Sequence, residues 1–87
     1  MAAANGENYA MSNLGYQYAD STSTLYNPQD AYMWMVLAVA NADSDRMEEL
    51  TTARDEYRLK LSPRQIDQAQ REALGLQEKI NAARQKQ

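Results

Sequence analysis

Ten consecutive apolar residues, from Ala31 to Ala40, constrain this chain more than any other feature. The run follows Asn27 and Pro28, which predict a helix start, because an asparagine side chain caps orphan backbone amides and proline suits the first helical position. A helix that is apolar on more than one side must be packed between other elements. Its ten residues are also far fewer than the roughly 20 that span a bilayer. We therefore expect a core helix with neighbours on both sides, and no membrane insertion.

A second helix is predicted upstream, from about Glu7 to Ala19. Ala10, Leu14 and Tyr18 are spaced four residues apart there and form an apolar stripe of helical period. Residues 20–24, Asp-Ser-Thr-Ser-Thr, should end this helix, because their side chains compete for backbone hydrogen bonds.

Two further helices are predicted in the second half of the chain. One runs from about Asp45 to Leu61, and the other starts at Pro63, where Ser62 and Gln65 form a capping box. Apolar residues at helical spacing mark their buried faces: Met47, Leu50 and Tyr57 in the third helix, and Ile66, Ala69, Ala73, Leu76 and Ile80 in the fourth. The sequence therefore predicts an all-α protein of about four helices.

The chain also resembles itself at an offset of 36 residues. Residues 2–11 align with residues 38–47, sharing two alanines, an asparagine and a methionine, and Leu14 then falls over Leu50. A repeat of this length is typical of helical hairpins, which bury their apolar faces by stacking on their neighbours. We expect one domain, a solenoid fragment of two α-hairpins at 7–42 and 43–82, followed by a frayed tail at 83–87.

Charge and composition exclude several classes of function. Residues 1–45 hold five acidic side chains and no Lys or Arg, and the whole chain carries a net charge of −3. Such a chain repels phosphate backbones, so nucleic acid is not an expected partner. There is no Cys and no His, which removes thiol chemistry, the usual zinc ligands and the commonest general base. Adjacent carboxylates such as Glu48 and Glu49 point about 100° apart on a helix and cannot share a substrate. We expect no enzyme, no cofactor and no metal site.

Part of the sequence is similar to a known repeat family. The residues that carry the likeness are Ala10, Leu14, Gly15 and Tyr18, a loop of twelve residues, and then Ala31, Tyr32, Met33, Trp34, Ala38 and Ala40. They resemble one Sel-one-like repeat, a family related to the tetratricopeptide repeats. Residues 53–70 look like the C-terminal extension of bacterial members. The loop departs from the family pattern, because Ser21, Ser23 and Thr24 stand where the family usually has two glycines and a valine.

This resemblance implies a protein-binding adaptor or scaffold without catalytic residues. It also implies that Leu14, Gly15, Tyr18, Ala31, Trp34 and Ala38 occupy packing positions. The apolar stripes add four more residues to the expected core, namely Ala10, Leu50, Ile66 and Ala69.

Tyrosines and methionines outside the packing positions are candidates for a partner-binding surface, because both residue types are enriched in protein interfaces. The candidates are Tyr9, Tyr16, Tyr26, Tyr32 and Met35. A second copy of the chain is an alternative partner, since a solenoid usually needs about three repeats and the first helix would leave an exposed edge. A small inhibitor or immunity-type protein that blocks one target is the alternative function.

The N-terminus has neither the basic start nor the apolar stretch of a signal peptide. We expect a cytoplasmic protein if Met1 is the natural start, and a periplasmic or exported protein if the chain is part of a longer secreted one.

Overall fold

The computed structural model describes the backbone of residues 2–85 and the side chains of residues 8–85. Over that range the chain forms four helices and no strand: α1 (Ala2–Ala19), α2 (Pro28–Ala40), α3 (Ser44–Arg58) and α4 (Pro63–Gln85). The predicted all-α class with about four helices is confirmed. The solenoid repeat and the family resemblance stay predictions.

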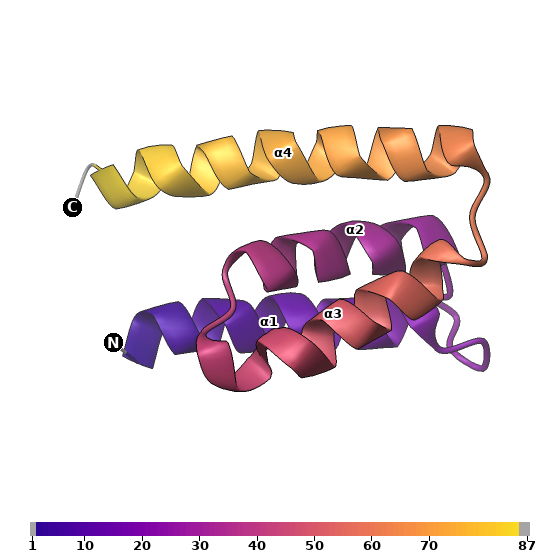
Figure 1. Ribbon diagram of the computed structural model, residues 1–87, viewed down its shortest axis with the longest axis horizontal. Helices are drawn as coiled ribbons and strands as arrows, with labels where there is room; N and C mark the ends of the chain where they lie inside the picture. Colours follow the sequence, from indigo (N-terminus) through magenta and orange to yellow (C-terminus); the bar gives the residue numbers. More distant parts are fainter. Residues whose placement is uncertain (1, 86–87) are drawn as a thin grey trace.

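Helix α2 lies in the middle of the molecule. Helices α1 and α3 pack against one side of it, and α4 runs along the other side (Figure 1). Although α3 and α4 are consecutive, each packs mainly on α2 and little on the other. The apolar run is therefore enclosed from both sides. No helix between residues 2 and 85 combines the length and the apolar character needed to span a bilayer.

The helix starts are set by local side-chain caps. The Asn27 side chain accepts a hydrogen bond from the Asp30 amide at 3.2 Å, and Pro28 occupies the first turn of α2. Before α4, the Gln65 amide donates to Ser62 Oγ at 3.2 Å and the Ser62 amide donates to Gln65 Oε1 at 2.9 Å. Both predicted starts are confirmed, and the second is a reciprocal capping box.

The other helix ends differ from the expected ones by a few residues. Helix α1 begins at Ala2, because alanine is the strongest helix former and three alanines open this segment. Helix α3 starts at Ser44, capped by Asp43, and ends at Arg58, before the predicted Leu61. Helix α4 continues to Gln85, so residues 83–85 of the expected frayed tail are helical, and residues 86–87 lie outside the described range.

The loop after α1 is held by its own short polar side chains. One Asp20 carboxylate oxygen accepts hydrogen bonds from the Thr22 amide at 2.9 Å and the Thr22 hydroxyl at 2.6 Å, and the Leu25 amide donates to Ser23 Oγ at 3.0 Å. The two bonds from Thr22 lower the pKa of Asp20 below its ordinary value. No described residue has a positive φ, so this turn does without the glycines of the family pattern.

The core is centred on α2. The buried hydrophobic residues are Met11, Ala31, Tyr32, Met33, Met35, Leu37, Ala38, Leu50, Ala69 and Ala73. Among the residues expected in the core, the structure buries Gly15, Ala31, Ala38, Leu50 and Ala69, and it half-buries Leu14, Tyr18, Trp34 and Ile66.

The buried face of α1 differs from the predicted one. Ala10, expected in the core, is exposed, and that assignment was wrong. The inward side of α1 instead carries Asn8, Met11, Ser12 and Gly15, which also recur at helical spacing. Apolar periodicity alone does not identify this face, because two of its four residues are polar.

Candidate protein-binding surface

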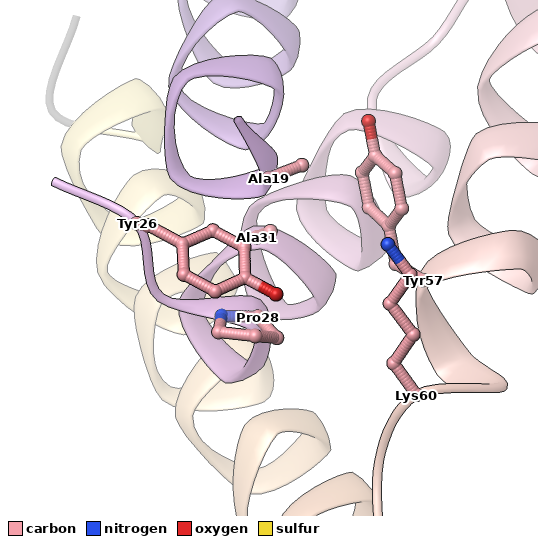
Figure 2. Close-up of a pocket in the computed structure, with 6 residues that line it drawn as sticks. All are labelled: Ala19, Tyr26, Pro28, Ala31, Tyr57 and Lys60. Atoms are coloured by element: carbon pink, nitrogen blue, oxygen red, sulfur yellow. The ribbon is translucent and has the colours of Figure 1, made fainter. Parts of the chain in front are cut away.

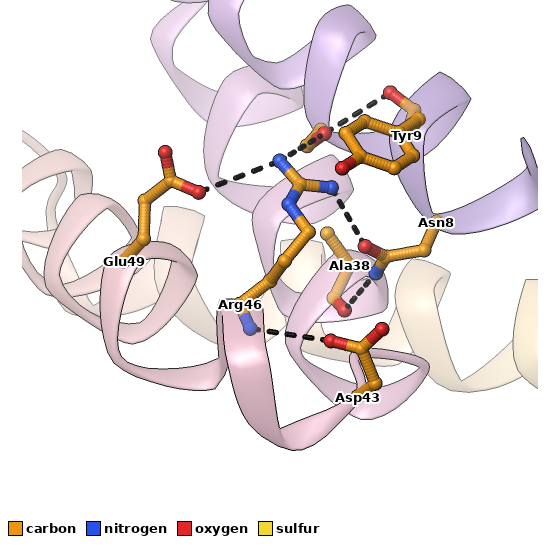
Figure 3. A network of polar contacts seen from close by, with 7 residues as sticks. Asn8, Tyr9, Ala38, Asp43, Arg46 and Glu49 are labelled. Atoms are coloured by element: carbon orange, nitrogen blue, oxygen red, sulfur yellow. Dashed lines mark hydrogen bonds and ion pairs between the residues drawn. The ribbon is translucent and has the colours of Figure 1, made fainter. Parts of the chain in front are cut away.

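Arg46 of α3 connects three helices through its guanidinium group. Its Nη1 donates to Asn8 Oδ1 at 2.7 Å (Figure 3). Its Nη2 donates to Ser12 Oγ at 3.1 Å. Asn8 in turn donates from Nδ2 to the backbone oxygen of Ala38, in α2, at 2.7 Å. We call Arg46, Asn8 and Ser12 the arginine clamp. It joins α3 to α1, and α1 to α2.

The clamp explains why two polar residues are tolerated inside. Asn8 and Ser12 are both buried, and burying such groups without partners costs about 1–3 kcal/mol each. Within residues 8–85, every buried side-chain nitrogen and oxygen atom has a hydrogen-bond partner. Without Arg46, Asn8 Oδ1 would lose this partner, and Ser12 would keep only the bond that its hydroxyl donates to the Tyr9 backbone oxygen at 3.0 Å.

The outer side of Arg46 is covered by an aromatic ring and a carboxylate. The guanidinium carbon lies 4.1 Å from the centre of the Tyr9 ring, which is a cation–π distance. Glu49 Oε2 lies 3.5 Å from Arg46 Nη2, and the Glu49 side chain is 60% exposed (Figure 3). Tyr9 itself is 53% exposed. These groups therefore face solvent while the clamp beneath them holds the backbone.

Tyr16 extends this surface along α1. It lies seven residues after Tyr9, on the same side of the helix, and is 38% exposed. Partial burial raises the pKa of the Tyr16 phenol above its ordinary value of 10.0; the Glu49 carboxylate also raises it, and Arg46 lowers it. Tyr57 of α3 has a pKa raised mainly by burial and then by Tyr16. We call Tyr9, Tyr16, Tyr57 and Glu49 the tyrosine face.

Tyr26 lies at one end of this face. With Ala19, Pro28, Ala31, Tyr57 and Lys60 it lines a narrow pocket of about 10 Å³ (Figure 2). That space is about what a single water molecule requires. The pocket cannot hold a substrate. Tyr26 and Tyr57 line it from opposite sides, so Tyr26 lies near the Tyr57 end of the tyrosine face (Figure 2).

Tyr32 and Met35 do not belong to any surface, and their assignment to the partner-binding set was wrong. Both are buried. The Tyr32 hydroxyl accepts a hydrogen bond from Gln70 of α4 at 3.1 Å, which satisfies its polar end inside the molecule. Met35 packs beneath Gly15, where a Cβ atom would lie only 2.9 Å from the Met35 methyl carbon. Their contact partners are far away in the sequence, so local spacing could not separate them from the exposed tyrosines.

Arg46 and Glu49 were not identified from the sequence as residues of this site, although the sequence contains a signal for Arg46. Arg46 lies in the first turn of α3, just after its cap Asp43. A positive charge is disfavoured at a helix N-terminus because the helix dipole is positive there. An arginine at such a position indicates a specific partner elsewhere in the fold, in this case Asn8 and Ser12.

A second exposed apolar region lies between α2 and α4. An open groove of about 340 Å³ is lined by Val36, Leu37, Ala40, Gln70, Ala73, Leu74 and Gln77. Leu74 is 61% exposed and lies outside the apolar stripe of α4. The groove carries no charged side chain, so it presents less chemistry for recognition than the tyrosine face.

Neither region has the features of a metal centre. Within the described part of the chain, no three acidic side chains gather as metal ligands would. Comparison with protein-family models, with curated proteins and with solved structures gave no match for this chain.

Proposed function

We propose that this chain is a non-catalytic helical module that binds another protein, acting as an adaptor or scaffold, and that the tyrosine face is its binding surface. The observation that supports this proposal most strongly is the pair of exposed rings, Tyr9 and Tyr16, on one side of α1, with the Tyr9 ring over the Arg46 guanidinium. The resemblance to Sel-one-like repeats supports the same function.

The physical support for this proposal is preorganisation. Tyrosine supplies a large contact area with few rotatable bonds, so little side-chain entropy is lost when a partner binds. The Tyr9 ring is already positioned by Arg46, and the helix beneath it is fixed by three polar contacts. Surfaces whose groups are held before binding have lower ordering costs than mobile ones.

Affinity capture from the native cells tests the proposal with two matched baits. The double variant Tyr9→Ser/Tyr16→Ser removes the rings of the tyrosine face, and Leu74→Ser removes an exposed apolar side chain from the α2–α4 groove. We expect the double variant to lose a partner that the wild-type chain and Leu74→Ser both retain. If the double variant retains every partner, or if only Leu74→Ser loses one, the tyrosine face is not the binding surface.

The identity of the captured protein decides the form of the function. An enzyme whose activity falls when the module binds would make this chain an inhibitor. A second copy of the chain would instead appear as a doubled molar mass in light scattering, and this doubling should disappear in Tyr9→Ser/Tyr16→Ser.

A further inference from the structure

Helix α4 forms one outer edge of the molecule (Figure 1), and its exposed Leu74 lies beside the α2–α4 groove. The α4 residues that line the groove are Gln70, Ala73, Leu74 and Gln77, which follow the spacing i, i+3, i+4 and i+7. Four residues at this spacing form the hole that receives a side chain from a facing helix in knobs-into-holes packing. A protruding side chain and a hole for such a side chain therefore lie next to each other on one surface.

A surface that contains both parts can pair with a copy of itself. In a two-fold symmetric dimer the same residues of both chains form the contact, so each chain offers its knob and its hole at once. Leu74 of each chain then enters the hole of the other. The residues beside that hole leave room for it, because Ala73 and Ala40 have small side chains.

The charges on the two sides of Leu74 also suit a second copy. Arg71 lies three residues before Leu74 and Glu78 four residues after it, so both share its side of α4. Two α4 helices that cross antiparallel at Leu74 place Arg71 of each chain against Glu78 of the other. Arg71 is 79% exposed and pairs with Asp67 through Nε only. Glu78 is exposed and forms no ion pair with any other residue from 8 to 85.

Net charge favours this surface over the tyrosine face for contact between copies. The chain carries a net charge of −3, so two copies repel each other in general. Near the Tyr9 end of the tyrosine face, α3 and its cap carry four exposed carboxylates, from Asp43, Asp45, Glu48 and Glu49. The lining of the α2–α4 groove carries no charge. Two copies therefore approach each other at lower electrostatic cost through the groove.

We propose that the α2–α4 groove is the contact between two copies of this chain, with their α4 helices antiparallel and Leu74 of each copy in the hole of the other. Seven residues line the groove, against about 20–30 per partner in a standard interface. The dimer is therefore weak and forms only in concentrated solution, so dilute samples contain the monomer. The tyrosine face lies on the other side of α2 and stays open, so this inference is independent of the proposed protein-binding function.

Sedimentation equilibrium of the full-length chain, from micromolar to millimolar concentration, tests the contact. Leu74→Lys places a charge in the groove. Leu59→Lys is the matched control, because Leu59 is 87% exposed just after α3 and the substitution adds the same charge. We expect wild type and Leu59→Lys to dimerise equally and Leu74→Lys to dimerise about tenfold more weakly or less still. A monomer at every concentration, or equal dimerisation of the two lysine variants, would overturn the proposal.

Charge reversals test the antiparallel arrangement. Arg71→Glu and Glu78→Arg change the net charge in opposite directions, yet each should weaken the dimer about three- to tenfold, because two attractive pairs become repulsive. The double variant Arg71→Glu/Glu78→Arg should recover the affinity of wild type. The two residues are about 10 Å apart along their own helix, so the recovery comes from contact between chains. Circular dichroism checks that the helices are intact. A double variant as weak as the single ones would overturn the antiparallel contact.

The two proposals fail in different ways. Tyr9→Ser/Tyr16→Ser should dimerise like wild type, because its changes lie away from the groove. If this variant loses the dimer while Leu74→Lys keeps it, the tyrosine face is the contact between copies and the groove proposal is overturned. Failure to capture any partner through the two tyrosines overturns the protein-binding function and leaves the groove dimer in place.

Discussion

Helix α2 packs against α4 on one side and against α1 and α3 on the other, and the two interfaces are built from different side chains. On the α4 side, the small residues Ala69 and Ala73 are fully buried against α2. On the other side, Arg46 crosses from α3 to the buried polar groups of Asn8 and Ser12. On the α4 side the polar contacts, such as the Gln70–Tyr32 hydrogen bond at 3.1 Å, join neutral groups, whereas on the other side they depend on the charged Arg46.

The difference between these interfaces separates a contact held mainly by apolar burial from one held by directional polar bonds. The α2–α4 contact depends mainly on the area removed from water, which many apolar side chains could supply. The arginine clamp has directional hydrogen bonds that fix the register of α1 against α3. Because the buried hydrogen bonds of the clamp fix this register, Tyr9 and Tyr16 are not needed inside and can remain at the surface.

The largest effect should come from Leu50, which is fully buried where α3 meets α2. Leu50→Ala should lower the free energy of unfolding by about 3 kcal/mol, because it loses apolar burial and leaves a cavity. Urea unfolding followed by circular dichroism measures this change. The exposed Leu74→Ala is the matched control and should change the free energy little. Equal costs for the two variants would mean that the α3 side has no apolar core of its own.

The second-largest effect on the free energy of unfolding should come from the arginine clamp. Arg46→Met keeps the apolar stem but leaves the buried Asn8 Oδ1 without its donor and removes one of the two hydrogen bonds of Ser12 Oγ, at a cost of about 2 kcal/mol in the free energy of unfolding. The control is Arg71→Met, because Arg71 pairs with Asp67 at 3.0 Å on α4 but is 79% exposed. Such a surface pair contributes about 0.5 kcal/mol or less. If the two methionine variants are equally stable, the clamp is not structural.

The sequence predicts the two sides of α2 unequally well. The starts of α2 and α4 could be predicted because Asn27 and Ser62 act on groups only three residues away. The buried polar face of α1 could not, because the groups that satisfy Asn8 inside, the Ala38 carbonyl and the Arg46 guanidinium, lie 30 and 38 residues later in the chain.

A hydrogen-bond partner at the same separation in the sequence explains why Tyr32 was wrongly predicted to lie at the surface. Its hydroxyl is satisfied by Gln70, also 38 residues away, so nothing near it in the chain signals burial. For the candidate site, Tyr9, Tyr16 and Tyr26 were found by residue type, whereas Glu49 and Arg46 were not, because their role depends on how α3 lies against α1.

Gly15 and Gly75 test the same difference between the two sides of α2, with a smaller expected change in stability. Gly75 in α4 has open space around the position of a Cβ atom, so Gly75→Ala should raise the free energy of unfolding by about 0.8 kcal/mol through helix propensity alone. Gly15 in α1 would place its Cβ 2.9 Å from the Met35 methyl carbon and 3.3 Å from Met35 Cγ. We expect Gly15→Ala to bring no net gain in thermal denaturation. A gain equal to that of Gly75→Ala would show that α1 packs loosely on α2.

The smallest effect concerns two phenols of the tyrosine face, the exposed Tyr16 and the half-buried Tyr57. The pKa values of Tyr16 and Tyr57 are raised in the folded state, chiefly by burial. Their contribution to stability is therefore complete below the ordinary value of 10.0 and is lost as pH rises through the folded values. Wild type should lose stability above pH about 10 more steeply than Tyr57→Phe, as urea midpoints across an alkaline series would show. Parallel curves would mean that burial does not affect this phenol.

The urea unfolding curve of Tyr9→Ser/Tyr16→Ser is the most direct test of the central claim, that Arg46 holds this side of the molecule while the tyrosines above it are available for binding. We predict a free energy of unfolding within about 1.5 kcal/mol of wild type, the sum of one exposed cation–π contact and two surface substitutions. A loss of about 4 kcal/mol or more would contradict the claim, because such values are typical of buried aromatic residues and would make the rings part of the core.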